Sequence, residues 1–200
     1  MTDYPRQQIT AVVLAGGRAT RMGGQDKGLI TLAGRPLVHH ALAALAPQVG
    51  QVLINANRNR ERYQALGYPV VADSVGDYDG PLAGMLAALE TMAGDWLLTA
   101  PCDSPLIPPD YAERMWTARA LADAELVVAR DQRRQQPVFL LLSRNLDHSL
   151  RDYLLAGERK IDRWFARHRL GEADFSDQAG MFRNINTPEE LAVLERELKT

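Results

Sequence analysis

Short apolar runs alternate along the chain with segments whose apolar residues recur every three or four positions. The run ITAVVLA, residues 9–15, is nearly continuous and rich in β-branched residues, which is typical of a strand buried on both faces. Similar runs predict further strands at residues 51–57, 68–73, 95–103, 125–130 and 137–142. Helices are predicted between and after them, from Pro36, near 58–62, at 81–93, from Pro108 and at 146–168. This alternation predicts an α/β, Rossmann-like fold in which helices flank a mostly parallel sheet.

The C-terminal segment NTPEELAVLEREL carries the clearest helix start in the chain. Thr187 is a candidate N-cap, Pro188 suits the first helical position, and Glu190 completes a capping box. The sequence shows no internal repeat, low-complexity tract or convincing linker. We therefore expect residues 1–200 to form a single domain.

Composition narrows the class of protein. Of the 200 residues, 46% are hydrophobic and 24% are charged, which is close to the globular average. Lysine and arginine number 23 against 25 acidic residues, so there is no basic field for binding nucleic acid. No apolar run approaches the roughly 18 residues of a membrane span, and the start MTDYPRQQ lacks a signal-peptide layout, so we expect a cytoplasmic protein without membrane contact. The lone cysteine, Cys102, excludes an internal disulfide and a multi-cysteine zinc site.

Polar residues or glycines follow four of the predicted strands. They are Gly16 with Gly17, then Asn55, Asp73 and Asp103. Ligands of open parallel sheets bind in the crevice outside the carboxyl ends of the strands. We therefore expect these residues to face one crevice, although they are far apart in sequence.

The segment LAGGRATRMGGQDK, residues 14–27, indicates phosphate binding. The pair Gly16-Gly17 directly after a buried strand can present backbone N–H groups to an anion. Arg21 and Lys27 add a planar cation and a compact one. An ordinary turn remains the alternative for the glycine pair alone. The patterns GxxxxGK[ST] and GxGxxG are both missing from this segment.

Motifs spread over nearly the whole chain resemble those of one family. After LAGG and RMGGQDK come NANR (55–58), Asp73-Ser74, GPLAGM (80–85), the PCD segment (101–110), LAGER (155–159) and NINTPEEL (184–191). In this order they resemble the nucleotidyltransferases, and within them the molybdenum cofactor guanylyltransferases, or MobA family. The segments 60–62 and 132–136 match poorly and are interpreted as surface variation that does not touch the motifs.

The resemblance implies transfer of GMP from GTP to the terminal phosphate of molybdopterin, which yields molybdopterin guanine dinucleotide and pyrophosphate. It implies Mg²⁺ as cofactor, with Asp103 as the metal ligand. Their positive charge assigns Arg21 and Lys27 to the triphosphate, and with Asp103 they are the expected catalytic residues. The resemblance also implies an acceptor side that includes Asn184 and Asn186. Gly80 and Gly84 are placed on that side too, if their helix start faces the substrate phosphate. Molybdenum-insertion proteins and molybdoenzyme chaperones are the implied protein partners. The positions that match the family's GTP site are Leu14, Ala15, Gly16, Lys27, Asn55, Asp73 and Asp103, and Gly17 is expected there as the second residue of the glycine pair.

Elementary chemistry agrees with this assignment. Attack of one phosphate on another brings two polyanions together, so cations and N–H donors matter more than an acid or a base. Mg²⁺ needs only one or two carboxylates when phosphate oxygens and water complete its shell. Simpler roles remain open: Asp103 could form a turn before Ser104, and Asn184 and Asn186 could merely lead into the cap at Thr187.

Two other functions remain to be distinguished. One is a nucleotidyltransferase for a sugar or polyol phosphate, because the opening loop is common to such enzymes. The other is a nucleotide-binding regulatory module without turnover. Release of pyrophosphate separates the enzymes from the module, and the choice of nucleotide and acceptor separates the enzymes from each other.

Overall fold

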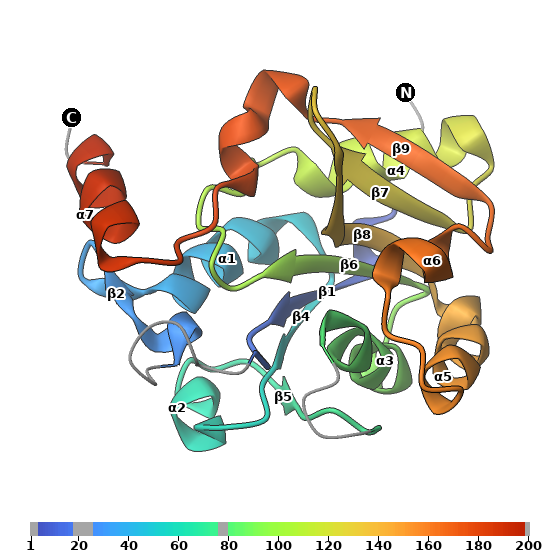
Figure 1. Ribbon diagram of the computed structural model, residues 1–200, viewed down its shortest axis with the longest axis horizontal. Helices are drawn as coiled ribbons and strands as arrows, with labels where there is room; N and C mark the ends of the chain where they lie inside the picture. The colour runs from blue at the N-terminus through green and yellow to red at the C-terminus, as the bar shows by residue number, and fades with distance from the viewer. Residues whose placement is uncertain (1–3, 18–25, 76–79, 199–200) are drawn as a thin grey trace.

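A seven-stranded sheet forms the centre of the protein in a computed structural model, which describes residues 4–17, 26–75 and 80–198 (Figure 1). The strands lie in the order β5-β4-β1-β6-β8-β7-β9. Strand β8 is antiparallel to both neighbours, and every other pair in this sheet is parallel. The strands are β1 (Ile9–Leu14), β4 (Gln51–Asn55), β5 (Val70–Val71), β6 (Trp96–Pro101), β7 (Leu126–Arg130), β8 (Gln135–Ser143) and β9 (Leu170–Asp174). The expected mostly parallel α/β sheet is confirmed.

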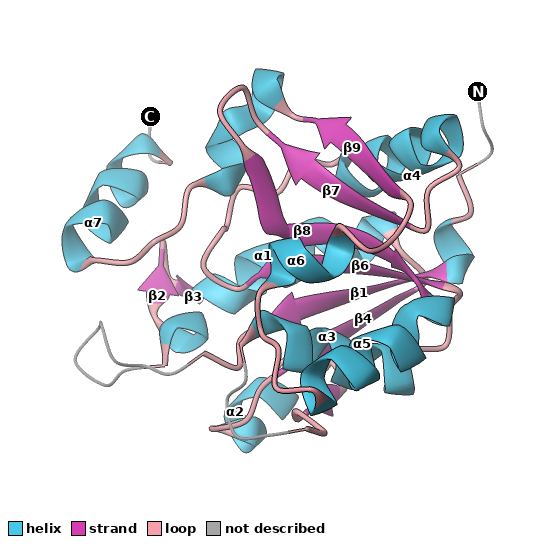
Figure 2. Cartoon of the chain, turned by 45° about the vertical axis from the view of Figure 1, so that its right-hand side comes forward, coloured by secondary structure: helices cyan, strands magenta, loops and turns pink. Residues whose placement is uncertain are grey.

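Helices cover both faces of the sheet (Figure 2). They are α1 (Leu37–Leu45), α2 (Arg60–Gln64), α3 (Pro81–Thr91), α4 (Tyr111–Ala122), α5 (Asp147–Leu155), α6 (Ile161–Phe165) and α7 (Pro188–Glu197). Short 3₁₀ turns are η1 (Arg6–Gln8), η2 (Lys27–Leu29), η3 (Ala46–Gln48), η4 (Arg144–Leu146) and η5 (Ser176–Phe182), and a small hairpin joins β2 (Thr31–Leu32) to β3 (Arg35–Pro36).

Strand β1 shows how the apolar pattern builds two cores. All six of its residues are buried, and successive side chains point to opposite faces. Ala11 and Val13 pack in one cluster with residues of α1 and α4. Val12 and Leu14 pack in the other with residues of α3, α5 and α6. Burial on both faces explains why this strand is a continuous apolar run instead of an alternating one.

The predicted helix at 146–168 is two helices. Helix α5 ends at Leu155, and Gly157 follows with φ +81°. The Gly157 N–H donates to Leu154 O at 3.0 Å, and the Glu158 N–H donates to Tyr153 O at 3.2 Å. These two bonds form a Schellman motif, which ends a helix at a left-handed residue that favours glycine. The sequence reasoning also missed β9, a strand at the edge of the sheet, and it placed the start of α4 too early, because that helix begins at Tyr111.

The capping box at the start of α7 is confirmed. Thr187 Oγ1 accepts from the Glu190 N–H at 3.2 Å, and Glu190 Oε2 accepts from the Thr187 N–H at 3.0 Å. The same carboxylate oxygen accepts from the Asn186 N–H at 2.6 Å. The cap therefore also fixes the backbone that enters the helix. Within the described ranges, no helix combines the length and apolar character that crossing a bilayer requires.

Candidate active site

The carboxyl ends of three parallel strands meet at one edge of the sheet. Leu14, the last residue of β1, pairs with Asn55 of β4 and with Pro101 of β6. The chain then continues into Gly16 and Asp103, so these segments start side by side. The strand ends meet as expected, whereas the single crevice expected for Gly16, Asn55, Asp73 and Asp103 stays a prediction. Arg21, the other predicted cation, lies outside the described residues.

The first cluster at this edge holds a carboxylate between two amides. Asn55 Nδ2 donates to Asp73 Oδ1 at 2.9 Å, and Asn57 Nδ2 donates to Asp73 Oδ2 at 2.7 Å. The Asp73 N–H returns a hydrogen bond to Asn57 Oδ1 at 2.9 Å. Asn57 was not among the predicted site residues, although its place in the NANR motif was a signal that could have identified it. The two amide side chains fix the direction in which the Asp73 carboxylate points.

Glycines allow the backbone to approach Asn55 closely. A Cβ on Gly16 would lie 2.9 Å from Asn55 Oδ1, and a Cβ on Gly84 would overlap the same oxygen. Gly84 is buried inside α3, so the structure places it beside Asn55, on the side of Gly16. Its predicted contact with molybdopterin stays a prediction. Gly17 is exposed, and a Cβ there would meet no described atom within 4 Å.

Three further predicted positions, Leu14, Ala15 and Gly80, differ in exposure. Leu14 and Ala15 are each 8% exposed, and their backbone is bonded to the neighbouring strands through Cys102 N to Leu14 O and Ala15 N to Asn55 O. Gly80 is exposed and is the N-cap of α3, with φ +82° and ψ −170°. Only glycine adopts this backbone conformation readily.

The second cluster centres on Lys27. Its Nζ lies 2.9 Å from Asp103 Oδ2 and 2.5 Å from Asn186 Oδ1, and it donates to both. The side chains of Lys27 and Asp103 are 26% and 14% exposed, so water screens this ion pair only in part. The Ile185 N–H donates to Asp103 O at 2.9 Å, which attaches the C-terminal segment to the end of β6.

The asparagines of the C-terminal segment lie on either side of a buried isoleucine. Ile185 is fully buried, whereas Asn184 is exposed and Asn186 is half-buried. Asn184 Oδ1 accepts from Ser104 Oγ at 2.7 Å. The Asn186 side chain is bonded to Lys27, so the acceptor side implied for Asn186 and the GTP site implied for Lys27 meet at this hydrogen bond. The cap residue Glu190 holds the Asn186 backbone and so helps to bring this side chain there.

The donors present suit a cation that is bound mainly through substrate. The described residues contain no group of three or more histidine, cysteine, aspartate or glutamate side chains that could enclose a metal. A single carboxylate at a strand end fits Mg²⁺, which usually keeps several waters and takes one or two carboxylates plus phosphate oxygens. Cys102 immediately precedes Asp103. Burial raises the pKa of its thiol, so this group stays protonated and is no nucleophile.

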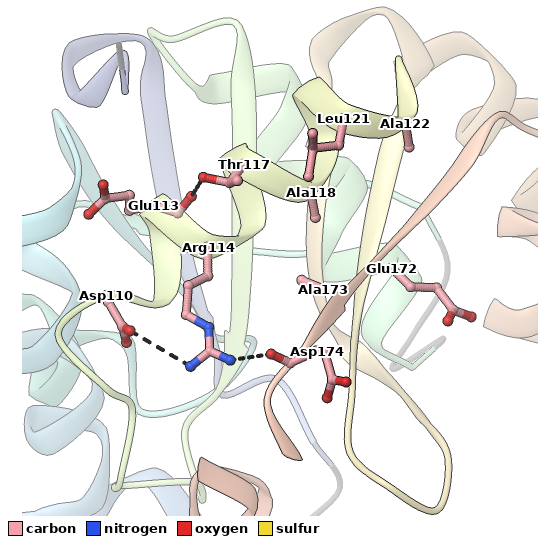
Figure 3. A pocket seen from close by; sticks show the side chains of 10 residues that line it. All are labelled: Asp110, Glu113, Arg114, Thr117, Ala118, Leu121, Ala122, Glu172, Ala173 and Asp174. Carbon is pink, nitrogen blue, oxygen red and sulfur yellow. Dashed lines mark hydrogen bonds and ion pairs between the residues drawn. The ribbon is translucent and has the colours of Figure 1, made fainter. Parts of the chain in front are cut away.

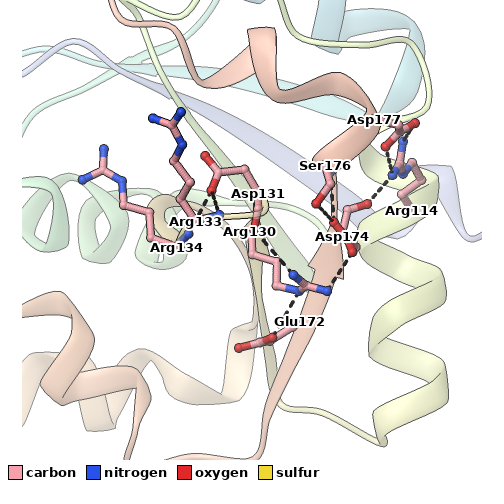
Figure 4. A network of polar contacts seen from close by, with 9 residues as sticks. All are labelled: Arg114, Arg130, Asp131, Arg133, Arg134, Glu172, Asp174, Ser176 and Asp177. Atoms are coloured by element: carbon pink, nitrogen blue, oxygen red, sulfur yellow. Dashed lines mark hydrogen bonds and ion pairs between the residues drawn. The ribbon is translucent and has the colours of Figure 1, made fainter.

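A hollow of about 590 Å³ lies elsewhere, between α4 and β9, and contains none of the predicted site residues (Figure 3). The guanidinium group of Arg114 in this hollow is already bonded to protein groups, because it pairs with Asp177 at 2.7 Å and also donates to Asp174 O. Next to it, Arg130 pairs with Asp174 and Glu172 (Figure 4). Hydrogen bonds from Ser176 lower the pKa of Asp174. We interpret these ion pairs as links between η5, the sheet edge and α4.

Comparison with known sequences identifies a family of nucleotidyltransferases. The model of the MobA-like NTP transferase domain matches residues 11–173. A molybdenum cofactor guanylyltransferase of Shewanella loihica is 52% identical over 183 residues, which cover 92% of this chain and 93% of the relative. Its counterpart in Shewanella sediminis is 51% identical with the same coverage.

Solved structures share the fold. Molybdopterin-guanine dinucleotide biosynthesis protein A from Archaeoglobus fulgidus aligns with a TM-score of 0.76 at 22% identity, covering 95% of this chain and 98% of that one. The 4-diphosphocytidyl-2C-methyl-D-erythritol synthase of Anaerococcus prevotii also reaches 0.76, at 12% identity, with 98% of each chain covered. At such identities the likeness shows the fold alone. The resemblance drawn from the sequence motifs is confirmed by the sequence relatives. The chain belongs to the MobA-like NTP transferase family and, within it, to the molybdenum cofactor guanylyltransferases.

Proposed function

We infer that the protein transfers GMP from GTP to the phosphate of molybdopterin, which yields molybdopterin guanine dinucleotide and pyrophosphate. The observation that carries this proposal is the position of Lys27 between Asp103 and Asn186. This arrangement places a cation, a carboxylate and an amide at the edge of the sheet where ligands of such folds bind. Family membership at about half identity supports the same reaction.

The chemistry needs positive charge and N–H donors around the reacting phosphates. We assign Lys27 to the triphosphate of GTP, and with it the backbone that follows β1 at Gly16 and Gly17. Arg21 belongs to the same proposal from its place in the motif. These groups would offset the repulsion between the two substrates and stabilise the charge of the transition state. No covalent nucleophile is required.

The nucleotide site extends from the glycines to Asp73. Asn55 and Asn57 hold the Asp73 carboxylate in one orientation, which prepares it to accept hydrogen bonds from a ligand. The Asp103 carboxylate accepts from Lys27 through Oδ2, and its second oxygen, Oδ1, is the atom we propose for Mg²⁺. A bound Mg²⁺ would neutralise charge on the phosphate oxygens.

The reaction also indicates the surroundings in which the protein works. GTP is a cytoplasmic metabolite, so we propose the cytoplasm as the location. We propose molybdenum-insertion proteins and molybdoenzyme chaperones as partners, since they would supply the acceptor or receive the product. We propose neither nucleic acid nor a membrane as a partner.

A panel of nucleotides and acceptors tests the function. The purified protein is incubated with Mg²⁺, with GTP, ATP, CTP or UTP, and with molybdopterin or a sugar phosphate. We expect pyrophosphate and the guanylylated pterin only with GTP and molybdopterin. Turnover of CTP or UTP with a sugar phosphate would instead assign the protein to the sugar class. Binding of GTP without pyrophosphate release under any condition would indicate a regulatory module.

The two asparagines of the C-terminal segment should behave differently from each other. Asn186→Ala removes an acceptor of Lys27, so we expect it to weaken the binding of both substrates, with GTP affinity reduced about threefold to tenfold, the scale of one hydrogen bond. Asn184→Ala removes only the bond from Ser104, so we expect weaker molybdopterin binding and unchanged GTP binding. Separate titrations with each ligand check this. If Asn184→Ala weakened both ligands equally, the asparagine would have only a structural role.

A further inference from the structure

One short segment contacts both described ends of the glycine-rich segment. Arg58, before α2, donates from Nη2 to Gly17 O at 3.3 Å. At the other end, Tyr63 Oη donates to Asp26 Oδ1 at 2.6 Å, and Asn59 Nδ2 donates to Asp26 Oδ2 at 3.0 Å. Both oxygens of the Asp26 carboxylate are therefore held by residues 58–63. Asp26 immediately precedes Lys27, the cation of the second cluster.

The tyrosine in this segment is rigidly placed. The Tyr63 side chain is fully buried, and a Cβ on Gly28 would lie 2.5 Å from its hydroxyl oxygen. The residue after Lys27 must therefore be small for the tyrosine to reach Asp26. Burial raises the pKa of the Tyr63 hydroxyl well above its usual value, so it stays an O–H donor.

The hydrogen bonds of Asp26 and the contacts of Lys27 fix adjacent residues from opposite directions. Asp26 is anchored to α2 through Tyr63 and Asn59, whereas the Lys27 side chain reaches across to Asp103 and Asn186. The Asp26 carbonyl also accepts from Leu29 N at 3.0 Å, which closes the η2 turn around Lys27. The backbone of Lys27 thus has a defined position from which the ammonium group reaches the strand ends.

We propose that Tyr63 is a positioning residue for the reaction: by holding Asp26, it places the Lys27 ammonium group beside Asp103, where the triphosphate is to bind. This rests on the proposed role of Lys27. The poorly matching residues 60–62 are exposed, as expected, but Arg58, Asn59 and Tyr63 on either side of them contact the glycine-rich motif. Displacement of a catalytic group by about 1 Å can reduce a rate by up to 10²-fold, so loss of one supporting hydroxyl can matter at a distance.

The test is a double-mutant cycle in the full chain. Tyr63→Phe removes only the hydroxyl, and Lys27→Met removes the charge that it positions. Each single variant and the double variant are compared with the parent by the dissociation constant for GTP, which needs no acceptor, and by kcat/KM for pyrophosphate release. In the parent, we expect Tyr63→Phe to lower GTP affinity and kcat/KM by roughly tenfold. In the Lys27→Met background, we expect the same change to lower either quantity by less than about twofold.

A matched control is available in the other core. Tyr153 is also buried, and its hydroxyl donates to Lys160 O at 2.8 Å, away from the site. Tyr153→Phe should cost a similar amount of thermal stability while leaving GTP affinity within about twofold of the parent. This control separates loss of a buried hydroxyl from loss of positioning.

Asn59→Ala provides a second variant at an exposed residue, in case Tyr63→Phe folds poorly. It removes the other bond to Asp26, and we expect a smaller loss of GTP affinity that also disappears in the Lys27→Met background. The same factor in both backgrounds, or no loss in either variant, would overturn the proposal. If the parent binds GTP but does not guanylylate molybdopterin, the proposed function fails, whereas the cycle measured on GTP affinity still decides the role of Tyr63.

Discussion

Replacing Asp103 with alanine should lower the turnover number by about 10²-fold or more, the scale of a lost electrostatic contact to the transition state. Asp103 stands at the carboxyl end of β6, is 14% exposed, and pairs with Lys27 at 2.9 Å. The variant would lose the proposed Mg²⁺ ligand and the partner that orients the lysine. The measurement is the initial rate of pyrophosphate release with GTP and molybdopterin over a range of Mg²⁺ concentrations.

Two controls accompany this variant. Asp103→Asn keeps the shape of the side chain but lacks the charge, so it should be impaired nearly as strongly. Asp177→Ala removes a carboxylate that pairs with Arg114 away from the site, and it should leave turnover near that of the parent. Near-normal turnover of Asp103→Ala at saturating Mg²⁺ would show that Asp103 has no role as metal ligand.

Replacing Lys27 with alanine should weaken GTP binding by about 1.5–3 kcal/mol, the scale of a hydrogen bond to a charged group. This corresponds to a roughly 10- to 150-fold higher dissociation constant. The ammonium group lies between Asp103 and Asn186, and without it the carboxylate would face the triphosphate uncompensated. Titration with GTP in the absence of acceptor measures the effect directly.

Lys27→Arg and Lys160→Ala complete this comparison. Arginine keeps the charge but has a planar head that cannot reproduce a compact ammonium group, so we expect only partial recovery of affinity. Lys160 is exposed at the start of α6, and its removal should change nothing in GTP binding. An unchanged dissociation constant for Lys27→Ala would remove this residue from the nucleotide site.

The parts of the fold that could be predicted are those determined locally or by strong periodicity. Strand β1 is a continuous apolar run because it is buried on both faces, and the cap at Thr187 needs only residues within one helical turn. The meeting of Asn55 and Asp103 at one edge followed from the parallel order of the strands. These features depend on local sequence or on topology, and both leave a pattern in the chain.

The features that escaped prediction depend on contacts between distant segments. Strand β9 alternates over only five residues and is held by pairing with β7. The bond from Lys27 to Asn186 joins residues 159 positions apart, so no local pattern could indicate it. Asn57 lies in the NANR motif, which could have marked it as a candidate, but its bond to Asp73 became known only from the structure. The fold was therefore easier to predict than the side-chain partners within the site.

The two hydrogen bonds of Lys27 predict that the binding of GTP and the binding of molybdopterin are coupled. An ammonium group has three N–H donors, and among the described residues Asp103 and Asn186 take one each. If a GTP phosphate accepts the third N–H, Lys27 is bonded both to GTP and to Asn186, whose segment is proposed to bind molybdopterin. Whatever GTP does to that lysine changes the environment of Asn186. Thermodynamic linkage then requires that molybdopterin alter the affinity for GTP by the same factor as GTP alters the affinity for molybdopterin.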